Sequence, residues 1–252
     1  EGTAVAVFEQ SGDSVDGRRF EQWSDVRRGI QNAEFVPFFQ PIVSIHTREV
    51  RSLEVLARWR HPERGLVPPS EFIPVAANAG MMVELEDGLL GKALDRFGGL
   101  DDELRSGLEM FVNLSSQQLQ DPGLADRLDD RLATREIERG SVGVEITEHE
   151  LLTPPEPIRE LVRRGYRVGI DDFGTGYSSM EFLTQIDVDV LKLDMSFVHG
   201  AASDPRDAAI VKIVQSLAAE LDLILVAEGI EEQKHHDLLI GEVTAYGGKP
   251  FD

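Results

Sequence analysis

Short apolar segments alternate with longer amphipathic ones along most of this chain. Helical periodicity fills most of the intervals, and Asp204 followed by Pro205 marks the start of one such helix, as N-cap and first helical residue. Runs rich in branched and aromatic residues, bounded by turn or helix signals, predict strands. These runs are Phe35–Val43, Val50–Trp59, Met110–Leu114, Val142–Ile146, Val168–Ile170, Val190–Leu193 and Leu223–Ala227.

The order of these segments predicts an α/β fold. About eight strands with intervening helices in one chain of this length favour a TIM-like (β/α)8 barrel over a doubly wound sheet. The first two strands are joined only by residues 44–48, which is too short for a parallel crossover. We therefore expect a barrel whose first strand is antiparallel.

An amphipathic segment precedes the first strand, over residues 17–32. Phe20, Trp23, Val26 and Ile30 fall on one face of a helix there. This stripe predicts packing against the core rather than a ligand site.

Composition narrows the class of protein. A hydrophobic content of 41% and a charged content of 28% are ordinary for a soluble globular protein. No apolar run approaches the length that spans a membrane, so no direct membrane insertion by this segment is expected. We expect a cytoplasmic protein, or the cytosolic part of a membrane-anchored one.

Charge and cysteine content limit the partners. The net charge of −21 argues against binding of duplex nucleic acid, which needs clustered Lys and Arg. It does not exclude a phosphate substrate, because carboxylates that bind divalent cations invert the local field. The chain has no cysteine, so a metal must be held by oxygen or imidazole ligands.

Two adjacent carboxylates, Asp171 and Asp172, lie between an apolar strand and the glycine-rich loop Gly174–Ser178. Two like charges side by side cost free energy unless a cation neutralises them, and a hard divalent metal would do so. An ordinary turn of Asp and Gly residues explains this stretch equally well when it is taken alone.

The other strands favour the metal site, because polar residues also occur at their carboxyl ends, where barrel enzymes place reactive groups. Isolated salt bridges would explain one or two of these positions but not five strands. Carboxylates with one amide oxygen suit Mg²⁺ or Mn²⁺, and two such ions that share an Asp would supply water activation and leaving-group stabilisation for phosphodiester hydrolysis. The residues are Glu54, Asn113, Glu145 with Glu148, Asp171 with Asp172, Lys192 with Asp194, and Glu228 with Glu231.

Two basic residues complete the expected site. Lys192 could position the attacking water or neutralise charge developing on phosphorus. Arg58 has a planar fork that suits a phosphate, although a salt bridge with a neighbouring strand is the alternative.

Taken together, these motifs resemble the EAL domain, the cyclic di-GMP phosphodiesterase family, from about residue 20 to residue 252. The namesake Glu-Ala-Leu reads Glu54-Val55-Leu56 here, which keeps the carboxylate. The motifs are residues 39–42 (FQPI), 54–59 (EVLARW), 72–74 (FIP), 113–115 (NLS), 145–148 (EITE), 171–176 (DDFGTG), 191–194 (LKLD) and 227–231 (AEGIE).

The resemblance implies a role for each matched residue. Glu54, Asn113, Glu145 and Asp171 would be metal ligands, and Asp172 would serve the second metal or its bridging water. Lys192 and Glu228 would orient the nucleophilic water. Glu148 would stabilise the loop that follows Asp171 and Asp172, and this loop couples dimer contacts to metal binding. Glu231 would contact the metal ligands rather than the metal itself. Gln40, Leu56 and Arg58 would line the dinucleotide site, alongside Asp172.

The reaction implied is hydrolysis of cyclic di-GMP to linear pGpG by a homodimer, in bacterial second-messenger signalling that governs biofilm formation. A cyclic di-GMP sensor of the same fold, with little or no turnover, is the alternative. The segment 243–250 lacks the family's Gln, which bears on substrate affinity rather than on metal binding. Residues 1–16 resemble the last strand of a GGDEF domain and a linker, which leaves 17–252 as the EAL domain.

Overall fold

The computed structural model describes residues 13–148, 156–175, 183, 185–230, 232, 235–236, 239 and 245–247, with the backbone alone for 13–18 and 245–247. A sheet closed on itself is the centre of the fold. Strand β1 pairs with both β2 and β9, and β3 lies outside the ring on β2. The strands are β1 (Phe35–Ser44), β2 (Val50–His61), β3 (Gly65–Val67), β4 (Glu109–Asn113), β5 (Val142–Thr147), β6 (Arg167–Phe173), β7 (Val190–Leu193), β8 (Ile224–Ala227) and β9 (Ala245–Gly247).

The direction of the strands confirms the predicted barrel with its antiparallel first strand. Strand β1 is antiparallel to β2 and to β9, whereas neighbours from β2 through β4 to β9 are parallel. All seven predicted strands are present. The three-residue strands β3 and β9 were not predicted, because they are too short to produce an alternating pattern.

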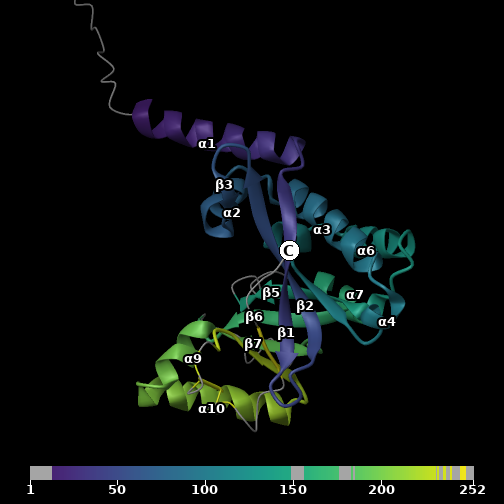
Figure 1. Cartoon of the computed structure of the whole chain (residues 1–252), viewed down its shortest axis with the longest axis vertical. Coiled ribbons are helices and arrows are strands. Elements are labelled where there is room, and N and C mark those ends of the chain that lie inside the picture. The colour runs from purple at the N-terminus through teal and green to yellow at the C-terminus, as the bar shows by residue number, and fades with distance from the viewer. Residues whose placement is uncertain are drawn as a thin grey trace, which may run out of the picture.

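Helices cover the outside of the ring. In Figure 1, α1 lies at one end of the molecule, α9 and α10 lie at the opposite end, and the hairpin of β1 and β2 runs between them. The helix at Pro205 begins as predicted, since Asp204 accepts a hydrogen bond from the amide of Arg206. The helices are α1 (Asp13–Gln31), α2 (Pro69–Asn78), α3 (Met82–Gly98), α4 (Asp102–Arg105), α5 (Ser116–Leu119), α6 (Leu124–Ala133), η1 (Arg139–Ser141), α7 (Glu156–Arg163), α9 (Met195–Ala201) and α10 (Pro205–Glu220).

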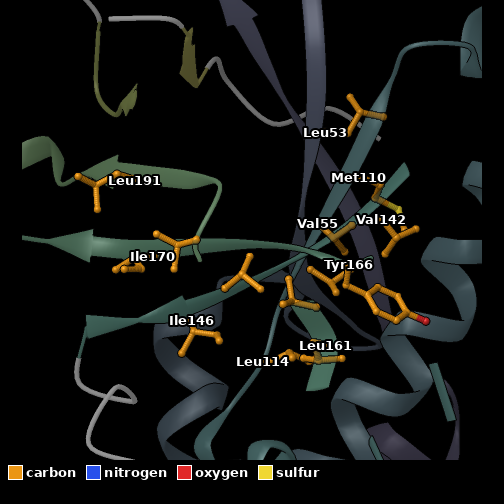
Figure 2. Packing of buried hydrophobic residues seen from close by; sticks show 14 of the residues in the cluster. Leu53, Val55, Met110, Leu114, Val142, Ile146, Leu161, Tyr166, Ile170 and Leu191 are labelled. Atoms are coloured by element: carbon orange, nitrogen blue, oxygen red, sulfur yellow. The ribbon is translucent and has the colours of Figure 1, made fainter. Parts of the chain in front are cut away.

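The main core lies between the strands and the helices. Figure 2 shows Val55 and Met110 of the strands packed near Leu161 of α7 and the ring of Tyr166. Burial of this layer is the chief stabilising term of the fold, at roughly 25 cal/mol per Å² of apolar surface removed from water.

A second apolar layer fills the inside of the ring. Ile42, Phe111, Val190 and Val226 form it. Phe111 can lie there because its neighbour in the register is Gly143, where a Cβ atom would come within 2.3 Å of the Phe111 ring. These apolar side chains lie below the carboxyl-end mouth and line a cavity of about 310 Å³ that also reaches Glu145.

The prediction that the whole stripe on the first helix packs against the core is wrong for its amino-terminal half. Val26 is buried, but Phe20 is 69% exposed and Trp23 is 38% exposed. The helix begins at Asp13, and only its later turns contact the apolar cluster around Phe35. Among the described residues, no helix is both long and apolar enough to cross a membrane.

Candidate active site

The polar residues of the site lie inside the barrel, one layer above its apolar filling. Side chains alternate between the two faces of a strand, so a residue two positions after an interior residue also points inward. Strand geometry alone therefore gathers the polar groups at the carboxyl-end mouth. The pairs are Phe111 with Asn113, Gly143 with Glu145, Gly169 with Asp171, Val190 with Lys192, and Val226 with Glu228.

Lys192 lies at the centre of four carboxylates. Its Nζ atom is 3.1 Å from Oε2 of Glu54 and 3.1 Å from Oε2 of Glu145. It is 3.0 Å from Oδ1 of Asp171 and 3.0 Å from Oε1 of Glu228. Since one ammonium faces four carboxylates, the centre retains an excess of negative charge.

The pKa directions reflect burial first and the neighbouring charges second. Burial lowers the pKa of Lys192, but the surrounding carboxylates, Glu145 first, outweigh burial and raise it well above its ordinary range. Burial raises the pKa of Glu145 well above its usual range, although Lys192 opposes that shift. Burial also raises the pKa of Glu228 to about 7. A further cation in the centre would favour the ionised form of these acids.

Asp171 belongs to two separate groups of oxygen donors. Glu54, Glu145 and Asp171 each offer one carboxylate oxygen within 4.8 Å of the others, and so do Asp171, Asp172 and Glu228. Asp172 adopts a φ of 55°, and burial followed by the charge of Asp171 raises its pKa. Oxygen sets of this kind suit hard divalent cations.

A buried atom of Glu145 also fits a metal. Its Oε1 atom is buried and has no hydrogen-bond partner in the described part of the chain, while Oε2 accepts a hydrogen bond from Lys192. A bare buried carboxylate oxygen is costly unless it is paired or coordinated. Asn113 is the direct neighbour of Glu145 in the register and adds an amide oxygen at the same mouth.

A cavity of about 450 Å³ opens beside these groups. Leu56, Asn113, Asp171 and Asp172 line one part of it. Much of the remaining lining is apolar and comes from α2, α3 and the residue after β4, with polar groups added by Glu86, Ser115 and Gln118. The apolar residues, called the apolar wall below, are Ile73, Met82, Leu85, Leu89, Leu90 and Leu114. The sequence did not predict this apolar wall. Only Ile73 and Leu114 belong to the motifs quoted above, which assigned them no role. The residues from α3 have the helical spacing that core positions also have.

Gln40 and Arg58 lie elsewhere on the hairpin. Gln40 faces Glu54 across the β1–β2 register. The Arg58 guanidinium is 5.6 Å from the centre of the Phe38 ring, and its Nη1 atom donates to the carbonyl of Ala57 at 2.8 Å. Neither residue lines the 450 Å³ cavity, and their contact with substrate stays a prediction.

Glu148 contacts the loop that follows the two aspartates. Its Oε2 atom accepts a hydrogen bond of 3.1 Å from the amide of Gly174. The structure thus brings Glu148 to the expected loop, and the coupling to a dimer stays a prediction. Glu231, and most of the segment 243–250 that lacks the family's Gln, lie outside the described residues.

Comparison with known proteins gives the chain a family. The family model of the EAL domain matches residues 23–241. The chain is 34% identical over 221 residues to the probable cyclic di-GMP phosphodiesterase PdeG of Escherichia coli, covering 85% of this chain and 43% of PdeG. It is 34% identical over 232 residues to the E. coli cyclic di-GMP phosphodiesterase PdeR, covering 89% of this chain and 35% of PdeR. The chain spans less than half the length of these relatives.

Solved structures agree in fold. The EAL enzyme Bd1971, in its form bound to cAMP and cyclic di-GMP, matches with a TM-score of 0.91 at 29% identity, covering 96% of this chain and 68% of that one. The MucR phosphodiesterase in complex with c-di-GMP matches with a TM-score of 0.87 at 30% identity, covering 92% and 97%; a MucR of Pseudomonas aeruginosa is also among the related sequences. The chain therefore belongs to the EAL domain family.

Proposed function

We propose that this chain hydrolyses one phosphodiester bond of cyclic di-GMP to give linear pGpG, with divalent metal ions bound at the barrel mouth. The observation that carries the proposal is the sharing of Asp171 by two groups of carboxylates around Lys192. The names of PdeG and PdeR and the c-di-GMP complex of MucR support the choice of substrate.

Two ions, Mg²⁺ or Mn²⁺, fit the donor set. Glu54, Asn113, Glu145 and Asp171 would hold one ion, and Asp172 would hold the second with Asp171. When bound, such ions supply Lewis-acid stabilisation and a nucleophile at neutral pH. The unpaired Oε1 atom of Glu145 supports the first position.

Lys192 and Glu228 would orient the attacking water. They lie 3.0 Å apart, so a water between them and the phosphorus could donate to the carboxylate and accept from the ammonium. The raised pKa of Lys192 keeps it protonated, and a fixed positive charge there would stabilise charge that develops on the phosphate.

The lining of the cavity suits both a base and a phosphate of the substrate. Its apolar wall, including Met82 and Leu89, suits a planar guanine base, while Asp171 and Asp172 with their ions would face the phosphate. Leu56 lines the same cavity. Gln40 and Arg58, from the adjoining hairpin, would complete the dinucleotide site together with Asp172.

Membership of the EAL family supports a proposal for the wider role. The domain, from residue 17 to 252, would act as a homodimer in cytoplasmic second-messenger signalling that governs biofilm formation, and residues 1–16 would be a linker with the tail of an upstream GGDEF domain. Glu148 would link dimer contacts to the loop at Gly174, and Glu231 would support the ligands from behind.

The test is turnover of cyclic di-GMP by the purified chain with Mg²⁺ or Mn²⁺, followed by chromatography. We expect pGpG from the wild-type protein and none from Glu54→Ala. Tight binding of cyclic di-GMP without product would overturn the proposed phosphodiesterase activity and favour a cyclic di-GMP sensor. The segment 243–250, which lacks the family's Gln, would then be the first region to examine for the cause.

A further inference from the structure

The pair formed by Lys192 and Glu228 depends on two different connections of the barrel. Lys192 lies on β7, which leads directly into α9, whereas Glu228 follows the last residue of β8. The amide of Glu228 donates to the carbonyl of Leu193 at 3.1 Å, which ties the end of β8 to the end of β7. The contacts of Gly229, the next residue in the loop after β8, come from helix α9.

His199 holds this loop from the side. It lies on α9, and its Nε2 atom is 2.8 Å from the carbonyl oxygen of Gly229. A carbonyl can only accept, so Nε2 carries the proton and donates. Gly229 is the residue directly after Glu228, and its carbonyl belongs to the peptide that joins it to Ile230, so the bond fixes the backbone one residue beyond Glu228.

The contact requires a glycine at position 229. Its φ is 72°, a left-handed conformation that glycine adopts at low cost. A Cβ atom there would come within 2.8 Å of Cβ of Met195 and 2.9 Å of Nε2 of His199. The loop and the helix are therefore packed as closely as the backbone permits.

The His199 ring is itself held in place. It stacks on the ring of His235, with 5.0 Å between ring centres and 25° between the planes. His235 is only 4% exposed, so the stack is part of the interior and limits the rotation of His199.

The same helix also supports the loop of the two aspartates. A Cβ atom on Gly174 would lie 2.8 Å from the ring of Phe197, so helix and loop are in close contact there too. Helix α9 thus contacts Gly174, just after the strand that carries Asp171 and Asp172, and Gly229, just after Glu228.

We propose that His199 is a positioning residue for the hydrolytic reaction: its Nε2–H bond to the Gly229 carbonyl holds Glu228 against Lys192 and within reach of the second metal ion. The proposal rests on the proposed phosphodiesterase function. His199 would not touch substrate. Partners of this kind behind a metal ligand typically contribute 10- to 100-fold to metal affinity or activity.

Two substitutions of similar size separate the hydrogen bond from simple packing. In His199→Gln, the side-chain amide nitrogen is separated from Cβ by the same number of bonds as Nε2 of the histidine. It can therefore still donate a hydrogen bond to the carbonyl of Gly229. In His199→Asn the amide is one bond shorter and corresponds to Nδ1, so the bond is lost. His46→Gln, at an exposed histidine in the turn between β1 and β2, is the matched control.

Two readouts are measured on each variant: kcat and KM for cyclic di-GMP, and Mn²⁺ affinity by electron paramagnetic resonance without substrate. We expect His199→Asn to lower kcat about tenfold with little change in KM, and to weaken one of two Mn²⁺ sites about tenfold. His199→Gln should stay within about threefold of wild type, as should His46→Gln. His199→Ala replaces the Asn variant if the latter fails to fold.

Equal losses in the Gln and Asn variants would overturn the proposal, and so would wild-type values in both. If the wild-type protein shows no turnover, the proposed function fails on its own, and the Mn²⁺ affinities still decide the role of His199.

Discussion

The ammonium of Lys192 lies 3.0 Å from Oδ1 of Asp171, the carboxylate that belongs to both groups of oxygen donors described above. In the metal-free protein, Lys192 is therefore the cation that offsets the acidic centre. Bound metal ions would neutralise much of the same negative charge. This relationship makes the stability of the fold depend on metal in a way that substitutions can reveal.

Replacement of Lys192 should destabilise the metal-free protein. Lys192→Met leaves Glu54, Glu145, Asp171 and Glu228 without their shared counter-charge, and loss of one partner from a buried ion pair costs about 3 kcal/mol or more. Urea unfolding in EDTA and in Mn²⁺ measures this. We expect Mn²⁺ to stabilise the variant more than it stabilises wild type.

The control for that measurement is Lys212→Met, at an exposed position of α10. If Lys192→Met is no less stable than Lys212→Met without metal, the ammonium does not offset the acidic centre.

The stability of the metal-free protein should rise as pH falls from 8 to 6. Burial raises the pKa of Glu228 to about 7 in the folded protein, above the value of an exposed carboxyl. Between those two values the folded state binds more protons than the unfolded chain, so the contribution is full at low pH and is lost as pH rises through 7. Thermal unfolding in EDTA across this range measures it.

Glu228→Gln removes this carboxyl and should flatten the pH dependence. Mn²⁺ should reverse the trend in wild type, because ions bind the deprotonated acids and so stabilise more at pH 8 than at pH 6. An unchanged slope in Glu228→Gln would show that another group titrates.

Much of the fold and the acidic centre could be predicted because strand periodicity controls both. Lys192 lies two residues after Val190, and Glu228 lies two residues after Val226, on or directly after strands that the sequence pattern predicts. The convergence of Lys192 and Glu228 at one mouth therefore follows from barrel geometry. The antiparallel β1 followed from a turn too short for any other connection.

Other features depend on contacts that no local pattern encodes. The apolar wall from Met82 and Leu89 has the same helical spacing as core positions. The hydrogen bond from His199 joins residues 30 positions apart. The exposure of Phe20 reflects how far α1 extends past the residues that cover its later turns.

The barrel interior should respond to a single methyl group. Gly143→Ala would bring a Cβ atom within 2.3 Å of the Phe111 ring, and overpacking of this kind costs about 1–3 kcal/mol. Phe111→Leu makes room, so the double variant should recover part of the loss relative to the sum of the two single variants. Denaturant unfolding of all four proteins forms the cycle.

Additive effects in that cycle would contradict the packing described for Phe111. The acidic centre lies one layer above the apolar side chains inside the barrel, so Mn²⁺ affinity gives a second readout of whether those side chains support the acidic residues.

The central claim is that two metal ions share Asp171, and titration calorimetry with Mn²⁺ tests it most directly. Wild type should bind two ions per chain, Glu54→Gln and Asp172→Asn should each weaken a different one, and Asp171→Asn should weaken both. Glu49→Gln, an exposed acid paired with Arg51 in the turn between β1 and β2, should retain both sites. One ion per chain in wild type, or one site of full affinity in Asp171→Asn, would contradict the account.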